Sequence, residues 1–309
     1  MTIKHTLILV GADKGGVGKT TTSRALLDFL ARKNIVARAF DTENPRGTLN
    51  RFYPQTTRII DLSNVADQMQ LLDTIETSPV KVSIVDLKAG NLSNALQIFD
   101  HIGVLDAAAA GDFNLGLVHV VGPSIASLDE MGEVSEFTKN MSYVVAKNFI
   151  NETNFFEWDD STYQKYFAQL QDAREIEIPK LNEMAYEQVD LAGVTFSNFT
   201  ANRDALGNSG DFSFVLRGYV RKWQRDLDAE FENLQLIKNL LHGSTVGGQK
   251  GAHPVAAKAA VASGSAKQAP TSSVPSRAEA RVNPAGKVAP SVKGTATAKA
   301  APTPAASVS

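Results

Sequence analysis

The stretch GADKGGVGKTTT, residues 11–22, constrains the fold of this chain more than any other part of it. It follows the short apolar run Thr6–Val10 and leads into a helical pattern over Thr20–Lys33. A buried strand, a glycine-rich loop and a helix in this order form a phosphate-binding unit. Glycines let backbone N–H groups turn inward, and the helix presents the positive end of its dipole. The stretch therefore predicts an α/β fold with an anion site at the end of its first strand.

The loop contains two lysines, Lys14 and Lys19, although a phosphate loop needs only one. Lys19 stands where the lysine of such a loop reaches the β and γ phosphates, and the hydroxyl of Thr20 follows it as a ligand of Mg²⁺. The ordinary pattern G-x-x-x-x-G-K-[ST] does not fit from Gly11. The loop thus departs from the common form in the segment that holds the additional lysine.

The segment KGGVGKTT, Lys14–Thr21, resembles the deviant Walker A motif K-G-G-x-G-K-[ST] of the ParA/MinD superfamily. The resemblance covers about residues 4–240 and implies a P-loop ATPase domain, with a mostly parallel sheet flanked by helices, that binds ATP and Mg²⁺. In that superfamily the first lysine crosses a dimer interface and touches the phosphates held by the other subunit, which implies the same role for Lys14. The loop residues assigned to the nucleotide are Lys14, Gly15, Gly16, Val17, Gly18, Lys19, Thr20 and Thr21.

Acids after two strands match the catalytic and metal positions of the superfamily. Asp41 and Glu43 follow the strand predicted over Ile35–Phe40, where relatives usually have D-x-D-P. The resemblance assigns Glu43 to orienting the attacking water, and it assigns Asp41 to catalysis and to the metal. Glu43 carries the charge of an aspartate on one more methylene, so we expect slow hydrolysis.

The apolar strand predicted over Val80–Val85 ends in Asp86, the Walker B arrangement in which the acid holds Mg²⁺ together with Thr20. Relatives read D-x-P-x-G at this point. Lys88 replaces the proline in this chain, which adds a cation near the site.

Two segments are candidates for contact with the base. The strand predicted over Ser142–Ala146 leads to Asn148, where relatives carry a polar residue that contacts adenine, although a turn-forming asparagine fits the position nearly as well. The segment Glu177–Leu181 resembles the loop that lines the base, with Pro179 as its rigid element.

Hydrophobic periodicity predicts alternating strands and helices, which favours a mostly parallel sheet covered on both faces. Besides the elements named above, it predicts strands over 116–121 and 191–196, and helices over 62–77, 125–140 and 160–174. A long helical pattern runs over 212–241. Its stripe of Phe214, Val215, Tyr219, Trp223, Leu227, Phe231, Leu234, Ile237 and Leu241 is expected to pack on the core of the domain.

Composition divides the chain near residue 242. Residues 243–309 contain no aromatic residue and hold seven of the twelve prolines, so we expect a disordered tail after a P-loop ATPase domain over 1–242. The tail has eight Lys or Arg and one acid, for a net charge of +7. The rest has 23 basic and 32 acidic residues, for a net charge of −9. The basic tail is either a solubilising extension or a loose contact to a polyanion such as nucleic acid.

The chain contains no cysteine, which excludes disulfides, zinc–thiolate sites and iron–sulfur clusters and fits a reducing compartment. The apolar run near the N-terminus is too short for a signal peptide or a membrane span. The end of the long helical pattern lacks the basic flanks of a membrane-surface helix. We therefore expect a cytoplasmic protein that does not bind membranes.

Three functions are compatible with these features. The resemblance favours a switch in which ATP closes a homodimer that partitions or positions a cargo, with slow hydrolysis stimulated by a partner protein. A biosynthetic ATP-dependent ligase of the related synthetase group is the first alternative, although such enzymes typically lack a lysine at the position of Lys14. A nucleotide-binding scaffold with little hydrolysis is the second, because of Glu43 and Lys88.

Overall fold

The computed structural model describes residues 4–151, 153–167 and 173–244. The chain divides into a first unit, Met1–Gly251, and a second, Ala252–Ser309, and all that follows concerns the first. The tail predicted for 243–309 lies outside the described residues from position 245 onward. Within the described ranges, every helix is too short or too polar to cross a bilayer.

A single sheet of seven parallel strands forms the centre of the unit, in the order β3-β2-β4-β1-β5-β6-β7. The mostly parallel sheet predicted from the sequence is confirmed. The strands are β1 (Thr6–Gly11), β2 (Ala37–Asp41), β3 (Thr57–Ile59), β4 (Val82–Asp86), β5 (Asn114–Val121), β6 (Ser142–Asn148) and β7 (Arg174–Ile178).

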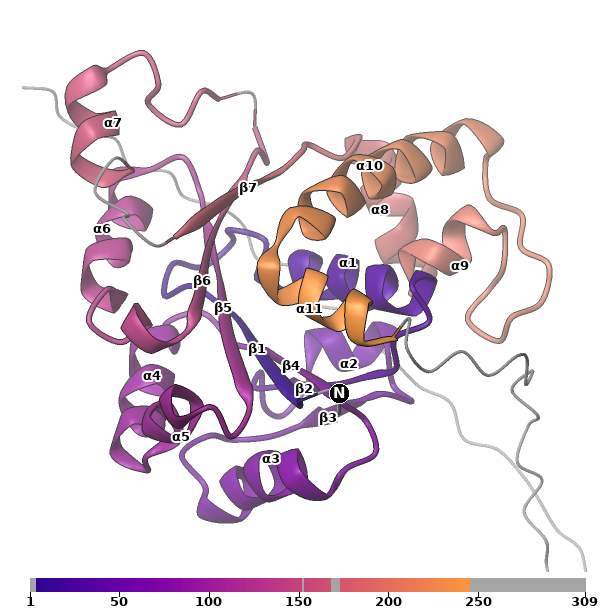
Figure 1. Cartoon of the computed structure of the whole chain (residues 1–309). Coiled ribbons are helices and arrows are strands. Elements are labelled where there is room, and N and C mark those ends of the chain that lie inside the picture. Colours follow the sequence, from indigo (N-terminus) through magenta and orange to yellow (C-terminus); the bar gives the residue numbers. More distant parts are fainter. Residues whose placement is uncertain (1–3, 152, 168–172, 245–309) are drawn as a thin grey trace, which may run out of the picture. The chain divides into compact units, whose positions relative to one another are not determined.

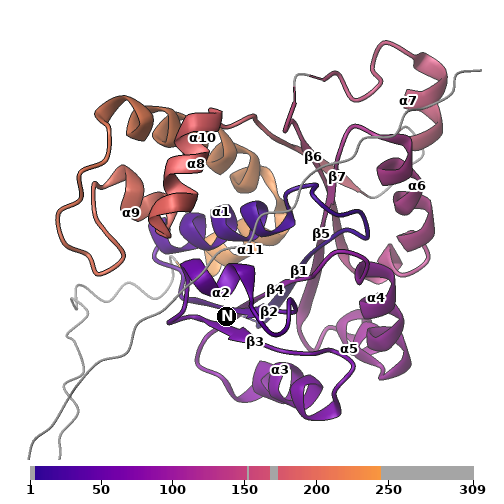
Figure 2. The same cartoon turned by 180° about the vertical axis from the view of Figure 1, so that it is seen from behind.

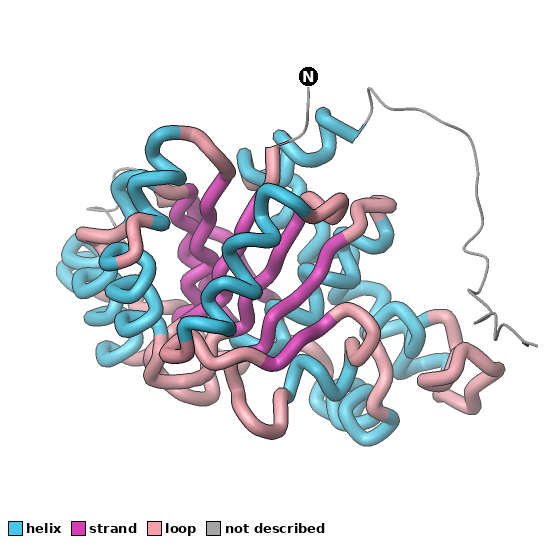
Figure 3. Tube along the Cα trace, turned by 90° about the horizontal axis from the view of Figure 1, so that it is seen from below, coloured by secondary structure: helices cyan, strands magenta, loops and turns pink. Residues whose placement is uncertain are grey.

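Helices cover both faces of the sheet (Figures 1 and 2). One face packs against α1 (Lys19–Arg32), α2 (Thr48–Phe52), α8 (Glu183–Ala192), α9 (Phe196–Thr200), α10 (Phe214–Asn233) and α11 (Gln235–Ser244). The other packs against α3 (Val65–Thr77), α4 (Leu92–His101), α5 (Val104–Ala110), α6 (Ile125–Val134) and α7 (Asp160–Tyr166). Figure 3 shows the strands between these two layers of helices.

The position of β1 in the middle of the sheet explains why Leu7, Ile8, Leu9 and Val10 are all apolar. Ile8 and Val10 belong to the core on the α1 side, whereas Leu7 and Leu9 belong to the core on the opposite side. Side chains alternate between the faces of a strand, so a strand that is covered on both faces needs apolar residues at every position. The same register brings the carboxyl ends of β1, β2 and β4 together, because Asp86 pairs with both Val10 and Asp41.

The strand predicted over residues 191–196 is wrong. The helix α8 continues to Ala192 and ends at Gly193, which has a left-handed φ of 62°, and α9 begins after Thr195. The Thr195 hydroxyl caps α9 by accepting the N–H of Asn198 at 3.0 Å. A helix end and a helix start that lie this close together produce a short apolar run resembling a strand. The last strand of the chain is instead β7, at one edge of the sheet, which overlaps the segment expected to line the base at Glu177 and Ile178.

The long helix predicted over 212–241 is two helices, because the backbone at Leu234 is extended between α10 and α11. Its expected stripe is only partly buried. Trp223, Leu227 and Phe231 lie in the core, whereas Phe214, Val215 and Tyr219 are exposed. The helix predicted over 125–140 is also shorter, since α6 ends at Val134. Of the helix predicted over 160–174, α7 covers Asp160–Tyr166, and residues 168–172 lie outside the described ranges.

Candidate nucleotide-binding site

The glycine-rich loop lies between β1 and α1, in the order that the sequence predicts. Gly16 and Gly18 have φ values of 75° and 96°, which favour glycine. At Gly18 there is also no room for a side chain, because a Cβ would lie 2.2 Å from Nδ2 of Asn148. The Asn148 amide donates to the carbonyl of Val17 at 2.7 Å and so fixes the loop from the end of β6.

The two lysines of the loop have different surroundings. Lys19 is buried, its Nζ donates to the carbonyl of Lys14 at 2.9 Å, and burial lowers its pKa. Nζ of Lys14 points elsewhere and donates to the hydroxyl of Ser124, the N-cap of α6, at 2.7 Å. Of these two lysines, Lys19 lines the cavity beside the loop and Lys14 does not.

The carboxylate of Asp86, at the end of β4, accepts the hydroxyls of Thr20 and Ser23, each at 2.8 Å. Burial raises its pKa to about 7. A carboxylate and an adjacent hydroxyl are oxygen ligands of the kind Mg²⁺ uses, and a cation would stabilise the buried charge. Among the described residues no group of three or more His, Cys, Asp or Glu is arranged to hold a metal. Thr20 and Asp86 could hold an ion together with oxygen ligands from phosphates and water.

The other two acids contact the start of α2. Asp41 is buried, and its carboxylate accepts the backbone N–H groups of Glu43, Leu49 and Asn50 at 2.9, 2.7 and 3.1 Å. Burial raises the pKa of Asp41, and the three N–H donors oppose that shift. The exposed Glu43 accepts the N–H and the hydroxyl of Thr48, also at the start of α2. The carboxylate of Asp41 thus holds the turn that carries Glu43.

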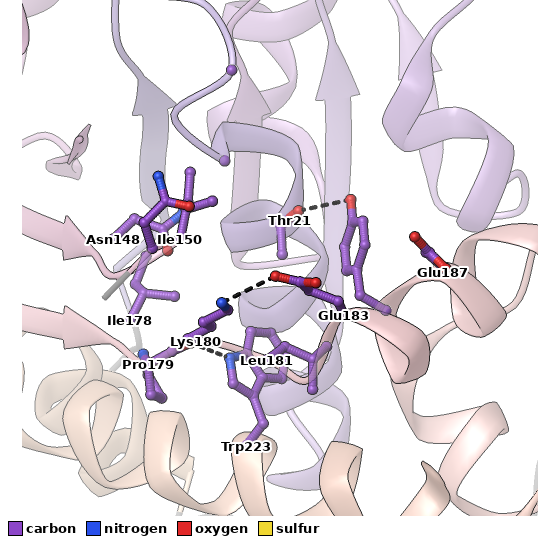
Figure 4. A pocket seen from close by; sticks show the side chains of 14 residues that line it. Thr21, Asn148, Ile150, Ile178, Pro179, Lys180, Leu181, Glu183, Glu187 and Trp223 are labelled. Atoms are coloured by element: carbon purple, nitrogen blue, oxygen red, sulfur yellow. Dashed lines mark hydrogen bonds and ion pairs between the residues drawn. The ribbon is translucent and has the colours of Figure 1, made fainter. Parts of the chain in front are cut away.

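Two cavities meet at the loop. One, of about 330 Å³, is lined by the loop and by the acids Asp41, Glu43 and Asp86, together with Lys88. The other, of about 380 Å³, is largely apolar and lies beside the ends of β6 and β7 (Figure 4). They share the lining residues Gly16, Gly18, Thr21 and Tyr186. A charged cavity that continues into an apolar one suits a nucleoside phosphate, with the phosphates in the charged part and the base in the apolar part.

The apolar cavity gathers side chains from β6, β7, α1, α8 and α10 (Figure 4). Pro179 is part of its wall, and its carbonyl accepts the indole N–H of Trp223 at 2.7 Å. Asn148 and Pro179, the two residues predicted to contact the base, thus line one cavity. Lys180 and Glu183 form an ion pair at 3.0 Å among the lining residues.

Four residues at the site were not predicted to belong to it from the sequence: Ser23, Ser124, Glu130 and Trp223. Ser23 lies one helical turn after Thr20, so helix spacing could have indicated it. Glu130 contacts the backbone of the loop across more than a hundred residues of sequence, and no local pattern signals such a contact.

No protein-family model matches this chain, and no curated protein matches it. The chain is similar to a ParA family ATPase from Chlorobium tepidum TLS, with 15% identity, a TM-score of 0.46, and coverage of 73% of this chain and 100% of that one. It is also similar to MinD from Aquifex aeolicus, with 16% identity, a TM-score of 0.41, and coverage of 71% and 95%. A Cyanothece McdA variant in complex with ATP shares 13% identity, with a TM-score of 0.41 and coverage of 74% and 97%. These likenesses concern the fold alone.

Proposed function

We propose that this chain is an ATP-dependent switch of the ParA/MinD type. ATP occupies the two joined cavities, with its phosphates on the loop and its base between β6, β7 and α10. The bound triphosphate closes a homodimer in which Lys14 of each protomer contacts the nucleotide of the other. Slow hydrolysis, stimulated by a partner protein, opens the dimer and releases a cargo that is partitioned or positioned.

The observation that carries this proposal is the separation of the two lysines. Lys19 lines the phosphate cavity, whereas Nζ of Lys14 lies outside that lining, on Ser124. A loop that served only its own nucleotide would have no use for a second lysine aimed away from it. A cation that reaches across an interface offsets the repulsion between two triphosphates and makes dimerisation depend on the γ-phosphate.

The remaining residues have roles that follow from their positions. Lys19 and the loop N–H groups bind the phosphates. Thr20 and Asp86 hold Mg²⁺, which neutralises phosphate charge. Glu43, at the rim of the same cavity, orients the attacking water.

One observation favours the scaffold alternative, in which ATP is bound and hardly hydrolysed. The carboxylate of Glu43 is engaged by Thr48 at the start of α2, so it must leave that contact to act on water. The rate of phosphate release distinguishes the switch from the scaffold.

Light scattering with and without Mg²⁺-ATP tests the proposal. The wild-type protein is expected to be a monomer without nucleotide and a dimer with it. Lys14→Ala is expected to bind ATP and remain a monomer, whereas Lys19→Ala loses ATP binding. A Lys14→Ala protein that dimerises like the wild type would show that the contact across the interface does not exist.

A further inference from the structure

The helix α6 contacts the loop through a buried carboxylate. Oε2 of Glu130 accepts the N–H of Asp13 at 2.9 Å, and Oε1 accepts the N–H of Lys14 at 2.7 Å. Glu130 is only 8% exposed. Hydrogen bonds from N–H groups to an ionised acceptor are stronger than neutral ones, and two consecutive N–H groups on one carboxylate fix the peptide between them.

The contact between Glu130 and the loop does not itself bind phosphate. The lining of the phosphate cavity begins at Gly16, two residues after Lys14. A negative charge buried next to that cavity works against the binding of an anion. Glu130 instead holds the first residues of the loop in place.

A second buried group supports Glu130. Nε2 of the fully buried His119, on β5, lies 3.5 Å from Oε2 of Glu130. The other ring nitrogen, Nδ1, is hydrogen-bonded to the hydroxyl of Tyr143, on β6, at 3.0 Å. His119 pairs in register with Gly11, where the loop begins. The carboxylate is therefore held from the sheet below as well as from its own helix.

Lys14 is held at three points. Glu130 accepts its N–H, Nζ of Lys19 donates to its carbonyl at 2.9 Å, and its own Nζ donates to Ser124 at 2.7 Å. The two side chains that hold its N–H and its ammonium group both belong to α6, one as its N-cap and one in its second turn. One contact fixes the backbone, and the other occupies the charged end.

We propose that α6 sets Lys14 for dimerisation through two opposing contacts. Glu130 is a positioning residue that fixes the backbone from which Lys14 reaches across the interface. Ser124 is the resting partner of the ammonium group and competes with the nucleotide of the other subunit. This inference rests on the proposed function, because it assigns Lys14 to a contact between subunits.

Two substitutions on α6 are expected to change the dimer dissociation constant in opposite directions. Ser124→Gly removes the resting partner and keeps an acceptable N-cap. Losing the Ser124 hydroxyl is expected to lower the dissociation constant of the Mg²⁺-ATP dimer by roughly fivefold for each lysine. Because both protomers carry the change, the dissociation constant falls by roughly 25-fold overall. Glu130→Gln leaves one of the two N–H groups without its acceptor and weakens the dimer by at least about tenfold. ATP affinity of the monomer changes by less than about threefold in both variants.

Matched controls separate these effects from a loss of stability. Ser213→Gly changes another N-cap serine, on α10, and Glu133→Gln changes an exposed acid on α6. Neither is expected to change dimerisation. A Ser124→Gly protein whose dimer is unchanged or weaker would overturn the resting role of Ser124. A Glu130→Gln protein that loses ATP affinity in parallel with dimerisation would show that Glu130 supports the whole loop instead of Lys14.

A measurement on the monomer keeps the two proposals distinguishable. Amide hydrogen exchange, followed by NMR without nucleotide, is expected to be at least about tenfold faster at Asp13 or at Lys14 in Glu130→Gln than in the wild type, at whichever N–H group loses its acceptor. Unchanged exchange at both residues would overturn the contact itself. If the wild-type protein stays monomeric in Mg²⁺-ATP, the proposed function fails and with it the role in dimerisation, whereas the exchange result still decides whether Glu130 fixes Lys14.

Discussion

Asp41 and Asp86 occupy paired positions on the neighbouring parallel strands β2 and β4, yet their carboxylates have different partners. Asp86 accepts two side-chain hydroxyls, those of Thr20 and Ser23. Asp41 accepts three backbone N–H groups around the start of α2. Hydroxyl partners can rearrange around a cation, whereas three backbone donors keep a carboxylate in place. We therefore predict a metal position at Asp86 and a structural position at Asp41, and substitution tests each separately.

Asp86→Asn is expected to remove the effect of Mg²⁺ on ATP affinity. The amide keeps the size of the side chain and loses the charge that attracts the ion. The gain in ATP affinity on adding Mg²⁺ should therefore be at least about tenfold smaller than in the wild type. Calorimetric titration with ATP, with and without Mg²⁺, measures this difference. Asp100→Asn, at an exposed position on α4, serves as the control. An undiminished response to Mg²⁺ in Asp86→Asn would place the ion elsewhere.

Asp41→Asn is expected to act mainly on stability. The amide offers one acceptor oxygen where the carboxylate offers two, so either the N–H of Glu43 or the N–H groups of Leu49 and Asn50 lose their partner. We expect the free energy of unfolding to fall by about 2 kcal/mol in urea denaturation. If stability is unchanged and hydrolysis is abolished, Asp41 belongs to the chemistry, as the resemblance implies.

The local parts of the fold could be predicted from the sequence, and the contacts between distant parts could not. The loop between β1 and α1 and the acids at the ends of β2 and β4 depend on neighbouring residues, whose spacing is visible in the chain. The Asp13–Glu130 contact spans 117 residues and exists only because β5 brings α6 under the loop. The edge strand β7 was missed although Ile176 and Ile178 alternate with exposed residues. The strand is short, and its last two residues also belong to the segment that resembles a base-lining loop, so the period of two is a weak signal there.

Glu43→Gln is expected to keep ATP binding and dimerisation and to lower the rate of hydrolysis by about a hundredfold, because the amide cannot accept a proton from water. Phosphate release, followed together with light scattering, measures both properties. Glu133→Gln is the control for the loss of one negative charge. Equal turnover in Glu43→Gln and the wild type would move the water-orienting role to another acid.

Trp223→Phe is expected to weaken ATP binding by about threefold to tenfold, because Pro179 loses the donor that fixes the wall of the apolar cavity. The indole ring also packs against Phe196, with centroids 4.9 Å apart, and phenylalanine retains much of that contact. Trp158→Phe is a matched control, since Trp158 is the other tryptophan of the chain and is 76% exposed. Equal ATP affinity in the two variants would show that the base does not depend on this wall.

His5 is expected to make the protein less stable in acid. It is 5% exposed, and Nε2 is hydrogen-bonded to the Ser83 hydroxyl at 2.9 Å. Burial, together with the positive charges of Arg38 and Lys81, lowers the pKa of His5 to about 4. The folded protein therefore binds this proton less readily than the unfolded chain, and stability is lost as the pH falls from 6.5 toward 4.

The effect of His5 amounts to roughly 3 kcal/mol at pH 4. Denaturation in urea at pH 7 and pH 4, compared between the wild type and His5→Gln, isolates it, because every other titrating group is common to both proteins. The difference in unfolding free energy between the two proteins should shift in favour of His5→Gln as the pH falls. His101→Gln, at an exposed position on α4, should keep the pH dependence of the wild type. The same pH dependence in His5→Gln as in the wild type would mean that His5 is protonated in the folded protein without cost.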